Sequence, residues 1–481
     1  MSKQAVTWLI IMIGAACAMG GCAVARDVVG GTDVAPVGDE IPVVTFDDEL
    51  VQVAQRLPGF GGMFFDDAGM LNIYLVETNP PDGQTVEEQH NRIKLALIAV
   101  FGQDNLNQHL QVGAGAIGQE NPVTPAGIQI LQGAYDMIQL AAWRPAVNRT
   151  LSLSGVVMTD MDESKNRLRI GIDRPEHRHK VEEALKNEGV PLDAVIIEHT
   201  DRTYLMQRRE QSQEVTRPIT GGLRIESEDS QFCTLGFSAT VEEDDSRGFI
   251  TASHCTGIRA KKSATRFFQD GIKGRNRYIG SEQNKPHYFT ASSQPNHRCQ
   301  PAARRCRYSD SVFVQYAQNA PVAYGRIARP TNTSGSIAID TANPVFWITD
   351  TGSIAIVGQR LHKVGSSTGW TFGRVSQTCI DVPAFYLNDS DAHMTLLCQK
   401  RIAATTDPKL LVGPGDSGAP VFAWRNQQVS QVDLFGIAWG GNADGSQLTF
   451  SPLRSIEAEL GELSLQATPD LSPPLPGVSR Q

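Results

Sequence analysis

Six of the eight cysteines in this 481-residue chain lie after residue 230, and this clustering limits the possible folds more than any other feature. The other two, Cys17 and Cys22, lie in an apolar N-terminal segment. An even number of cysteines in an exported protein favours disulfides, here three. No CxxC or HxxxH spacing accompanies them, so a metal site is a weaker interpretation, and buried free thiols are the other alternative. The six are Cys233, Cys255, Cys299, Cys306, Cys379 and Cys398.

The N-terminal segment has the features of an export signal. Lys3 precedes an apolar run over residues 6–13, which is too short to span a membrane and leads into small residues. We therefore expect residues 1–21 to be a signal peptide and the mature chain to be extracytoplasmic. The sequence MGGC that ends at Cys22 resembles a bacterial lipoprotein signal, which implies a lipid on Cys22 as the one membrane contact. Simple secretion is the alternative.

Net charge divides the chain at the same place as the cysteines. Residues 23–216 hold 16 Lys+Arg against 29 Asp+Glu, whereas residues 217–481 hold 26 against 23. The length of the chain also requires more than one domain. A total charge of −9 gives no basic surface for nucleic acid, so we expect no such partner. The expected segments after the signal are a flexible linker (22–42), an N-terminal domain (43–216), a second domain (217–464) and a disordered Pro-rich tail (465–481).

The N-terminal domain is predicted to be α+β. Residues 63–76 have the pattern of a hairpin, and a helical pattern follows over about 86–100. A second hairpin over 156–172 precedes a helix over about 175–187 and a short buried strand over 194–198. The region contains no cluster of catalytic residue types. Its two neighbouring histidines, His177 and His179, lie among Arg and Lys residues, as on a solvated helix face.

Two motifs in the second domain point to nucleophilic catalysis. They are TASHC, residues 251–255, and GPGDSGAPVF, residues 413–422. A serine hydroxyl is a poor nucleophile near neutral pH and needs an adjacent base, often an imidazole that a buried carboxylate orients. His254 is the candidate base and Ser417 the candidate nucleophile. The alternative for His254 is a structural histidine beside a disulfide.

Both motifs, in this order and with Cys233 and Cys255, resemble those of the chymotrypsin-like serine proteases. The closest branch is the secreted bacterial one that includes the streptogrisins and alpha-lytic protease. The resemblance covers about residues 217–460, with Ser253 where Ala or Gly is frequent and Ala419 where Gly is common. It implies a mainly β fold of two six-stranded antiparallel barrels. It also implies a serine endopeptidase that acts on proteins or peptides without cofactor or metal.

The resemblance further implies the third catalytic residue and the oxyanion hole. Asp310, which opens an alternating strand, is the best match for the carboxylate that orients His254. Three other aspartates between His254 and Ser417 compete with it, Asp270, Asp340 and Asp350. The backbone N–H groups of Gly415 and Ser417 would form the oxyanion hole. Asp416 would be a structural carboxylate that holds this loop.

The specificity pocket is also implied by the resemblance. Counting back from the nucleophile places the floor of the pocket at Leu411, where trypsin-like enzymes carry aspartate. A small or medium apolar substrate side chain is therefore expected. The expected lining is Leu411, Ala438, Trp439, Gly440 and Leu448.

The family implies a disulfide Cys233–Cys255 beside the histidine loop. For the remaining four cysteines the simplest pairs are Cys299–Cys306 and Cys379–Cys398, although six cysteines allow fifteen pairings. The intervening segment 259–307 holds twelve Lys+Arg. It is either a solvated insertion or a patch that attracts acidic substrates or the acidic N-terminal domain.

Proteases of this group carry N-terminal pro-regions, and residues 155–201 resemble such a pro-domain. We therefore expect residues 43–216 to be a pro-region that binds the protease domain, with processing between about Thr203 and Leu223. Two alternatives stay open. One is a catalytically silent binding protein with the same fold. The other is an active protease whose N-terminal domain is a permanent binding or anchoring module.

Overall fold

The structure, a computed structural model, describes residues 43–206 and 216–466. Short gaps interrupt these ranges at 82, 104–105, 107–127, 230, 257–263, 270–277, 294–297, 302–303, 353, 387–391, 393, 406–409 and 426–427. The predicted signal peptide and linker, Cys22 with its predicted lipid, and residues 467–481 lie outside the described residues. Among the helices described, none has the length and apolar character to cross a membrane.

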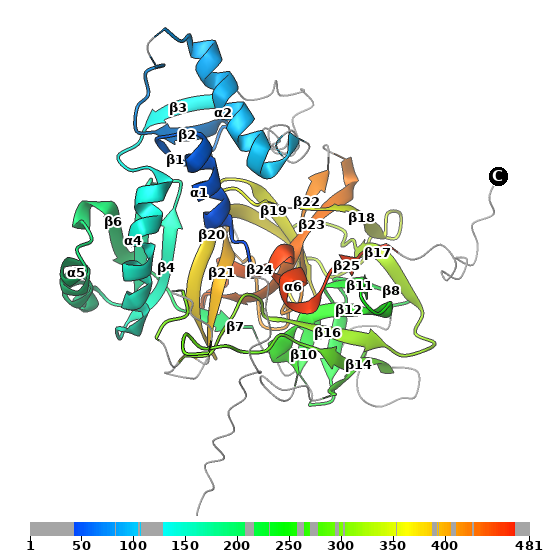
Figure 1. Ribbon diagram of the computed structural model, residues 1–481. Helices are drawn as coiled ribbons and strands as arrows, with labels where there is room; N and C mark the ends of the chain where they lie inside the picture. Colours follow the sequence, from blue (N-terminus) through cyan, green and yellow to red (C-terminus); the bar gives the residue numbers. More distant parts are fainter. Residues whose placement is uncertain are drawn as a thin grey trace, which may run out of the picture. The chain divides into compact units, whose positions relative to one another are not determined.

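The described residues before 207 form an α+β region built from two similar units (Figure 1). In each unit a hairpin is followed by a helix and then by a strand that pairs in parallel with the second strand of the hairpin. The first unit contains β1 (Phe60–Phe65), β2 (Leu71–Leu75), α2 (Val86–Phe101) and β3 (Ile128–Gln132). The second contains β4 (Val156–Asp162), β5 (Arg167–Ile172), α5 (Arg178–Asn187) and β6 (Val195–His199).

Two further helices, α1 (Phe46–Arg56) and α4 (Met137–Arg149), pack against each other beside these sheets. Three helices of the region begin with capping boxes. In a capping box the side chain of the N-cap residue accepts the backbone N–H of the residue three positions later, and the side chain of that later residue accepts the backbone N–H of the N-cap residue. The N-cap residues are Thr45, Thr85 and Asp136. The predicted hairpins, helices and final strand of this region are therefore formed.

The region after residue 216 is mainly β and contains two large sheets. The first has eight strands in the order β10-β9-β13-β14-β16-β12-β11-β25. Their bounds are β9 (Arg224–Ser227), β10 (Phe232–Thr234), β11 (Phe237–Val241), β12 (Ser246–Ala252), β13 (Arg266–Phe268), β14 (Tyr278–Asn284), β16 (Ser311–Tyr316) and β25 (Leu463–Ser464).

In the second sheet six strands pair in a closed antiparallel cycle, β19-β20-β21-β24-β23-β22 and back to β19. They are β19 (Arg360–Gly365), β20 (Gly369–Phe385), β21 (Met394–Ala403), β22 (Pro420–Arg425), β23 (Gln428–Gly441) and β24 (Gln447–Pro452). The remaining elements of this region are β8 (Ile219–Gly221), β15 (Cys306–Arg307), β17 (Val322–Ala328), β18 (Val345–Thr351) and α6 (Leu453–Leu460).

The α+β region joins the second sheet directly. Strand β4 pairs with β20 at Thr159 and Asp381, so the sheet β4-β5-β6 continues into the six-stranded cycle. Strand β7 (Thr203–Leu205) pairs with both β20 and β23. The apolar core of the α+β region also includes side chains of the other region, among them Ile354 and Ile356. All described residues belong to one compact unit.

The three disulfides are Cys233–Cys255, Cys299–Cys306 and Cys379–Cys398, as in the simplest pairing. Leu465, the first residue of the segment predicted to be the C-terminal tail, is only 8% exposed and belongs to an apolar core cluster. Burial of its side chain extends the folded region past the predicted end at 464.

Candidate active site

Strand pairing brings His254 and Asp310 together. His254 lies in a short 3-10 turn, Ser253–Cys255, that directly follows β12. Asp310 directly precedes β16, and β12 and β16 are antiparallel with Ala252 opposite Ser311. The residue after one strand therefore lies beside the residue before the other. The disulfide from Cys255 to Cys233 ties the turn to β10.

The three predicted catalytic side chains form one hydrogen-bonded chain. His254 Nδ1 contacts Asp310 Oδ2, and His254 Nε2 lies 2.7 Å from Ser417 Oγ. All three residues are buried. A proton on Ser417 can therefore pass to the imidazole while the carboxylate holds the other ring nitrogen. The competing aspartates lie elsewhere: Asp340 accepts from backbone N–H groups in an exposed turn, Asp350 pairs with Arg425, and Asp270 lies outside the described residues.

The second carboxylate oxygen of Asp310 has partners of its own. Ser253 donates its hydroxyl proton to Oδ1 at 2.6 Å, and the Arg307 guanidinium donates to the same oxygen at 3.2 Å. Burial by itself raises the pKa of Asp310. The attraction and hydrogen bond of His254, the charge of Arg307 and the Ser253 bond outweigh it and hold that pKa at about 2. The carboxylate is therefore ionised throughout the neutral range.

The loop that carries Ser417 requires glycine at two positions. Gly415 and Gly418 have φ of 104° and 90°, a region that residues with a Cβ rarely adopt. A Cβ on Gly418 would lie 2.2 Å from Thr234 O. The Asp416 carboxylate holds the same loop, because it accepts the N–H groups of Ser367, Thr368 and Gly413 and pairs with buried Lys363.

The end of the α+β region occupies this site. The carbonyl oxygen of Met206 accepts hydrogen bonds from Ser417 Oγ at 2.7 Å and from Gly415 N at 3.2 Å. The N–H of Met206 donates to Trp439 O at 3.3 Å. Preceding it, β7 runs antiparallel to β23, with Leu205 opposite Gly440. A peptide carbonyl thus lies against the nucleophile and a predicted oxyanion-hole donor.

The predicted pocket residues divide into two groups. Leu411, Ala438 and Leu448 are buried in the same apolar cluster as the Met206 side chain. The backbone of Gly440, on β23, pairs with Leu205 of β7. The side chain of Trp439, the fifth predicted pocket residue, belongs to a different apolar cluster and donates its Nε1 proton to Gln399 at 2.9 Å.

Sequence reasoning missed two residues beside Met206. A Cβ placed on Gly441 would lie 2.5 Å from Val412 Cγ1 and 2.9 Å from Met206 Cε. Because Gly441 has no side chain, it leaves room there for the side chains of Val412 and Met206. Both residues are sequence neighbours of predicted pocket residues, which was the signal available. The role of Arg307 had no sequence signal beyond the excess of basic residues in its segment.

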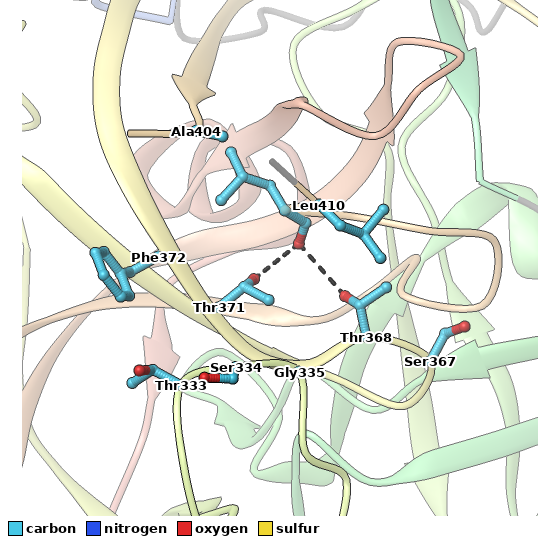
Figure 2. A pocket seen from close by; sticks show the side chains of 10 residues that line it. Thr333, Ser334, Gly335, Ser367, Thr368, Thr371, Phe372, Ala404 and Leu410 are labelled. Carbon is cyan, nitrogen blue, oxygen red and sulfur yellow. Dashed lines mark hydrogen bonds between the residues drawn. The ribbon is translucent and has the colours of Figure 1, made fainter. Parts of the chain in front are cut away.

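A separate cavity of about 360 Å³ lies beside the Leu411 segment (Figure 2). Its lining includes Leu411 but none of the other predicted pocket residues, and Thr368 and Thr371 donate their hydroxyl protons to Leu411 O there. The exposed side chain of Leu410 also lines it. This cavity is distinct from the place that Met206 occupies.

Several solved bacterial serine proteases are similar to about half of this chain. No family model and no curated protein matches it. The Nocardiopsis protease NAPase has 19% identity and a TM-score of 0.34. The alpha-lytic protease homologue N4 has 22% and 0.33, and the chymotrypsin of Cellulomonas bogoriensis has 18% and 0.31. Each similarity covers 52% of this chain and 99% of the other. The function proposed below rests on the side chains of this chain itself.

Proposed function

We propose that this protein is an exported serine endopeptidase, made as a precursor whose N-terminal domain, residues 43–216, is a pro-region. The observation that carries the proposal is the hydrogen-bonded chain Asp310–His254–Ser417, which ends on the carbonyl group of a peptide segment at Met206. A serine, an imidazole and an ionised carboxylate in this order are the groups that peptide hydrolysis through an acyl-enzyme requires.

In this mechanism Ser417 Oγ attacks the substrate carbonyl carbon and His254 Nε2 takes its proton. Asp310 stabilises the imidazolium that forms and remains ionised itself. The N–H groups of Gly415 and Ser417 stabilise the oxyanion, and loss of one such donor typically costs about 3 kcal/mol. His254 then protonates the leaving amine, and water releases the acyl group by the reverse sequence. The six-stranded cycle of the second sheet would be one of the two expected barrels, and the first sheet would contain the other.

The pro-region role is supported by the junction between the two regions. Arg144 of the α+β region donates to the Asp381 carboxylate at 3.2 Å, and Arg298 donates to both Asp381 and Asp47. These four side chains are at most 5% exposed. While β7 pairs with β23, no other extended peptide can occupy the same edge, so the bound region also inhibits. The three disulfides agree with an extracytoplasmic protein, either secreted or held at the envelope through Cys22.

Chemical labelling and peptide hydrolysis test this function. The full chain and its Ser417→Ala variant are treated with a fluorophosphonate probe before and after limited proteolysis, and hydrolysis of a casein-derived peptide mixture is followed. We expect labelling and hydrolysis only in the wild type, with at least a 10⁴-fold loss in the variant. Absence of labelling after proteolysis of the wild type would favour the silent binding protein. Hydrolysis by an uncut chain would favour the permanent module.

A further inference from the structure

We propose that the enzyme cleaves its own chain after Met206, and that the Met206 side chain indicates its primary specificity, a long apolar side chain such as Met or Leu. This inference rests on the proposed function and adds the bond and the substrate class to it. The expected processing range, Thr203 to Leu223, contains this bond without distinguishing it from its neighbours.

The backbone at Met206 is arranged as that of a substrate. Its carbonyl oxygen contacts both the nucleophile, at 2.7 Å, and the Gly415 N–H, at 3.2 Å. Its own N–H is bonded to Trp439 O, and the residues before it form an added antiparallel strand on β23. Among the peptide carbonyls described, this is the one that is hydrogen-bonded to Ser417 Oγ.

The preceding residues are held on both sides, which fixes the register of the strand. Arg401 donates to the Thr203 hydroxyl at 3.1 Å, and the Tyr204 ring packs against that of Phe385 with centroids 6.4 Å apart. Asn442 donates its side-chain N–H to Asp201 at 3.2 Å. A shift by one residue would break these contacts and would turn the Met206 side chain away from its pocket.

The side chain of Met206 is 5% exposed and lies in an apolar cluster with Leu411, Val412, Ala438 and Leu448. Its terminal methyl group approaches Gly441, where a Cβ would come within 2.9 Å. The pocket therefore accepts a long, flexible apolar chain. A carboxylate or an ammonium group there would lose its hydration without gaining an opposite charge.

The step balances as an ordinary acyl transfer. Ser417 Oγ bonds to the Met206 carbonyl carbon as its proton moves to His254, and the bond to the nitrogen of Gln207 breaks as that nitrogen receives the proton. Water then cleaves the ester. One new carboxylate at Met206 and one new amine at Gln207 result.

Mapping the new N-terminus tests the bond. The full-length wild type, Met206→Leu and Met206→Asp are expressed, and the fragments are identified by mass spectrometry. We expect a fragment that starts at Gln207 in the wild type, a rate within 5-fold for Met206→Leu, and at least a 100-fold slower appearance for Met206→Asp. An enzyme that reacts with the fluorophosphonate but starts at another residue would overturn the inference and leave the proposed function standing. Lack of reaction and of any fragment would overturn both.

Profiling of the processed enzyme with a peptide library tests the specificity. We expect Met and Leu before the cleaved bond to be preferred at least 10-fold over Lys, Glu and Gly. Val412→Ala should raise the rate for Phe relative to Met by about 10-fold, because it enlarges the pocket. Leu410→Ala, two residues away in the cavity of Figure 2, is the matched control and should leave the preference unchanged. A basic or acidic preference, or identical profiles for the two variants, would overturn the assignment.

We further infer that Arg307 and Ser253 are positioning residues for Asp310. Arg307 is completely buried, on β15, and its guanidinium contacts Asp310 Oδ1 and the Ser253 hydroxyl. Its other terminal nitrogen donates to Pro286 O at 3.1 Å, and its plane lies 4.7 Å from the centre of the Tyr288 ring. One oxygen of Asp310 thus contacts His254, while the other accepts hydrogen bonds from the Ser253 hydroxyl and the Arg307 guanidinium, an arrangement that we call the clamp.

The clamp has an electrostatic consequence. A fixed positive charge beside Asp310 weakens the attraction that this carboxylate exerts on a protonated His254. The other charged groups nearby are Lys285, paired with Glu282 at 3.1 Å, and Glu459, which accepts from the N–H of Tyr308 and the hydroxyl of Ser309. These stay in place when Arg307 is changed. Removing Arg307 should therefore favour the protonated, inactive imidazole.

Steady-state kinetics of Arg307→Met, Arg307→Lys and Ser253→Ala test the clamp, with Arg305→Met, exposed and two residues away, as control. For Arg307→Met we expect kcat to fall 10- to 100-fold at nearly constant KM, and the acid limb of kcat/KM to move to higher pH. Arg307→Lys should restore part of kcat, and Ser253→Ala should lose less than 10-fold. If Arg307→Met does not fold, Arg307→Lys and Ser253→Ala still decide. A folded variant with the kcat and pH profile of Arg305→Met would overturn the inference.

Discussion

The active site and the junction between the two regions are both buried and charged, yet they are completed to different degrees. At the active site both oxygens of Asp310 and both ring nitrogens of His254 are hydrogen-bonded. At the junction, atoms of Asp47, Arg144, Asp160, Glu163 and Arg401 are buried without a hydrogen-bond partner, and beside the candidate active site the same holds for Nε of Arg307. Buried polar atoms without partners reduce stability. More of these atoms lie at the junction than at the candidate active site, which agrees with the proposal that the junction can be separated.

The disulfides follow the same division. All three lie within residues 233–398, and the α+β region contains none. Its core instead depends on helix caps, on apolar packing and on side chains of the other region such as Ile354. A region held in this way loses part of its core when the contact is broken, whereas the disulfide-linked region keeps its cross-links.

The largest expected effect comes from a change in the loop that carries Ser417, which we call the locked site because its glycines and the hydrogen bonds around it fix its conformation. Gly418→Ala forces a Cβ to within 2.2 Å of Thr234 O at a φ of 90°, so the loop of Ser417 must move. We expect at least a 100-fold loss of fluorophosphonate labelling rate together with a lower Tm. Gly461→Ala, at a φ of 95° in the same region but with its nearest atom, Val241 Cγ1, 3.7 Å from the added Cβ, is the matched control and should keep full activity. Equal labelling rates in the two variants would contradict the locked site.

The next effect is on the junction alone. Arg144→Met leaves Asp381 with Arg298 as its remaining ion-pair partner and removes the hydrogen bonds to Thr159 O and Cys379 O. Loss of one member of a buried ion pair typically costs about 3 kcal/mol. Denaturant unfolding of the uncut Ser417→Ala chain should show that loss. The processed enzyme has no residue 144, so its Tm and activity should be those of the wild type, and any change there would contradict a separable junction.

The junction should also weaken as pH rises. Burial, followed by the charge of Asp162, raises the pKa of Asp160 to about 7. Gln377 donates to Asp160 at 3.0 Å, and the charged groups acting on or beside it are Asp47, Arg144, Asp162, Arg169 and Arg401. A carboxyl that binds its proton more tightly in the joined state stabilises that state fully below its ordinary pKa, near 4. This contribution declines up to about pH 7 and is constant above it.

The measurement is the pH dependence of unfolding of the uncut Ser417→Ala chain between pH 4 and 8. Stability should fall over this range, and Asp160→Asn, which cannot ionise, should reduce the slope. Asp244→Asn, an exposed carboxylate in the other region, serves as control. A slope that Asp160→Asn leaves unchanged would assign the effect to other junction carboxyls such as Glu163 and contradict the role of Asp160.

The smallest expected effect is on a helix start in the α+β region. Thr45→Ala removes the half of the capping box in which the Thr45 hydroxyl accepts the Asp48 N–H at the start of α1, and it leaves the bond from the Thr45 N–H to the Asp48 carboxylate. Loss of such a cap costs about 1 kcal/mol. The uncut chain should unfold at lower denaturant by that amount, whereas hydrolysis by the processed enzyme should not change. A stability loss as large as that of Arg144→Met would show that Thr45 also supports the junction, where Arg298 lies 3.5 Å from its hydroxyl.

Local sequence patterns were sufficient for several parts of the molecule. The hairpins and helices of the α+β region follow from residue periodicity and capping. The motifs around His254 and Ser417 also carried their own local geometry, since glycine is required where φ is positive. Asp310 was chosen among four aspartates because it opens an alternating strand, and that strand, β16, pairs beside His254. In each case the information lies within a few residues of the side chain concerned.

Other features depend on residues far apart in the chain, and only the tertiary structure decided them. Arg307 is three positions from Asp310, but its bonds to the Ser253 hydroxyl and to Pro286 O span 54 and 21 positions, and Arg144 meets Asp381 across 237 positions. Met206 reaches Ser417 across 211 positions because β7 is added to β23. The sequence by itself determined which groups could perform the chemistry. Pairing between distant strands decided which peptide bond lies against these groups, because the order of residues does not reveal which distant strands form hydrogen bonds with each other.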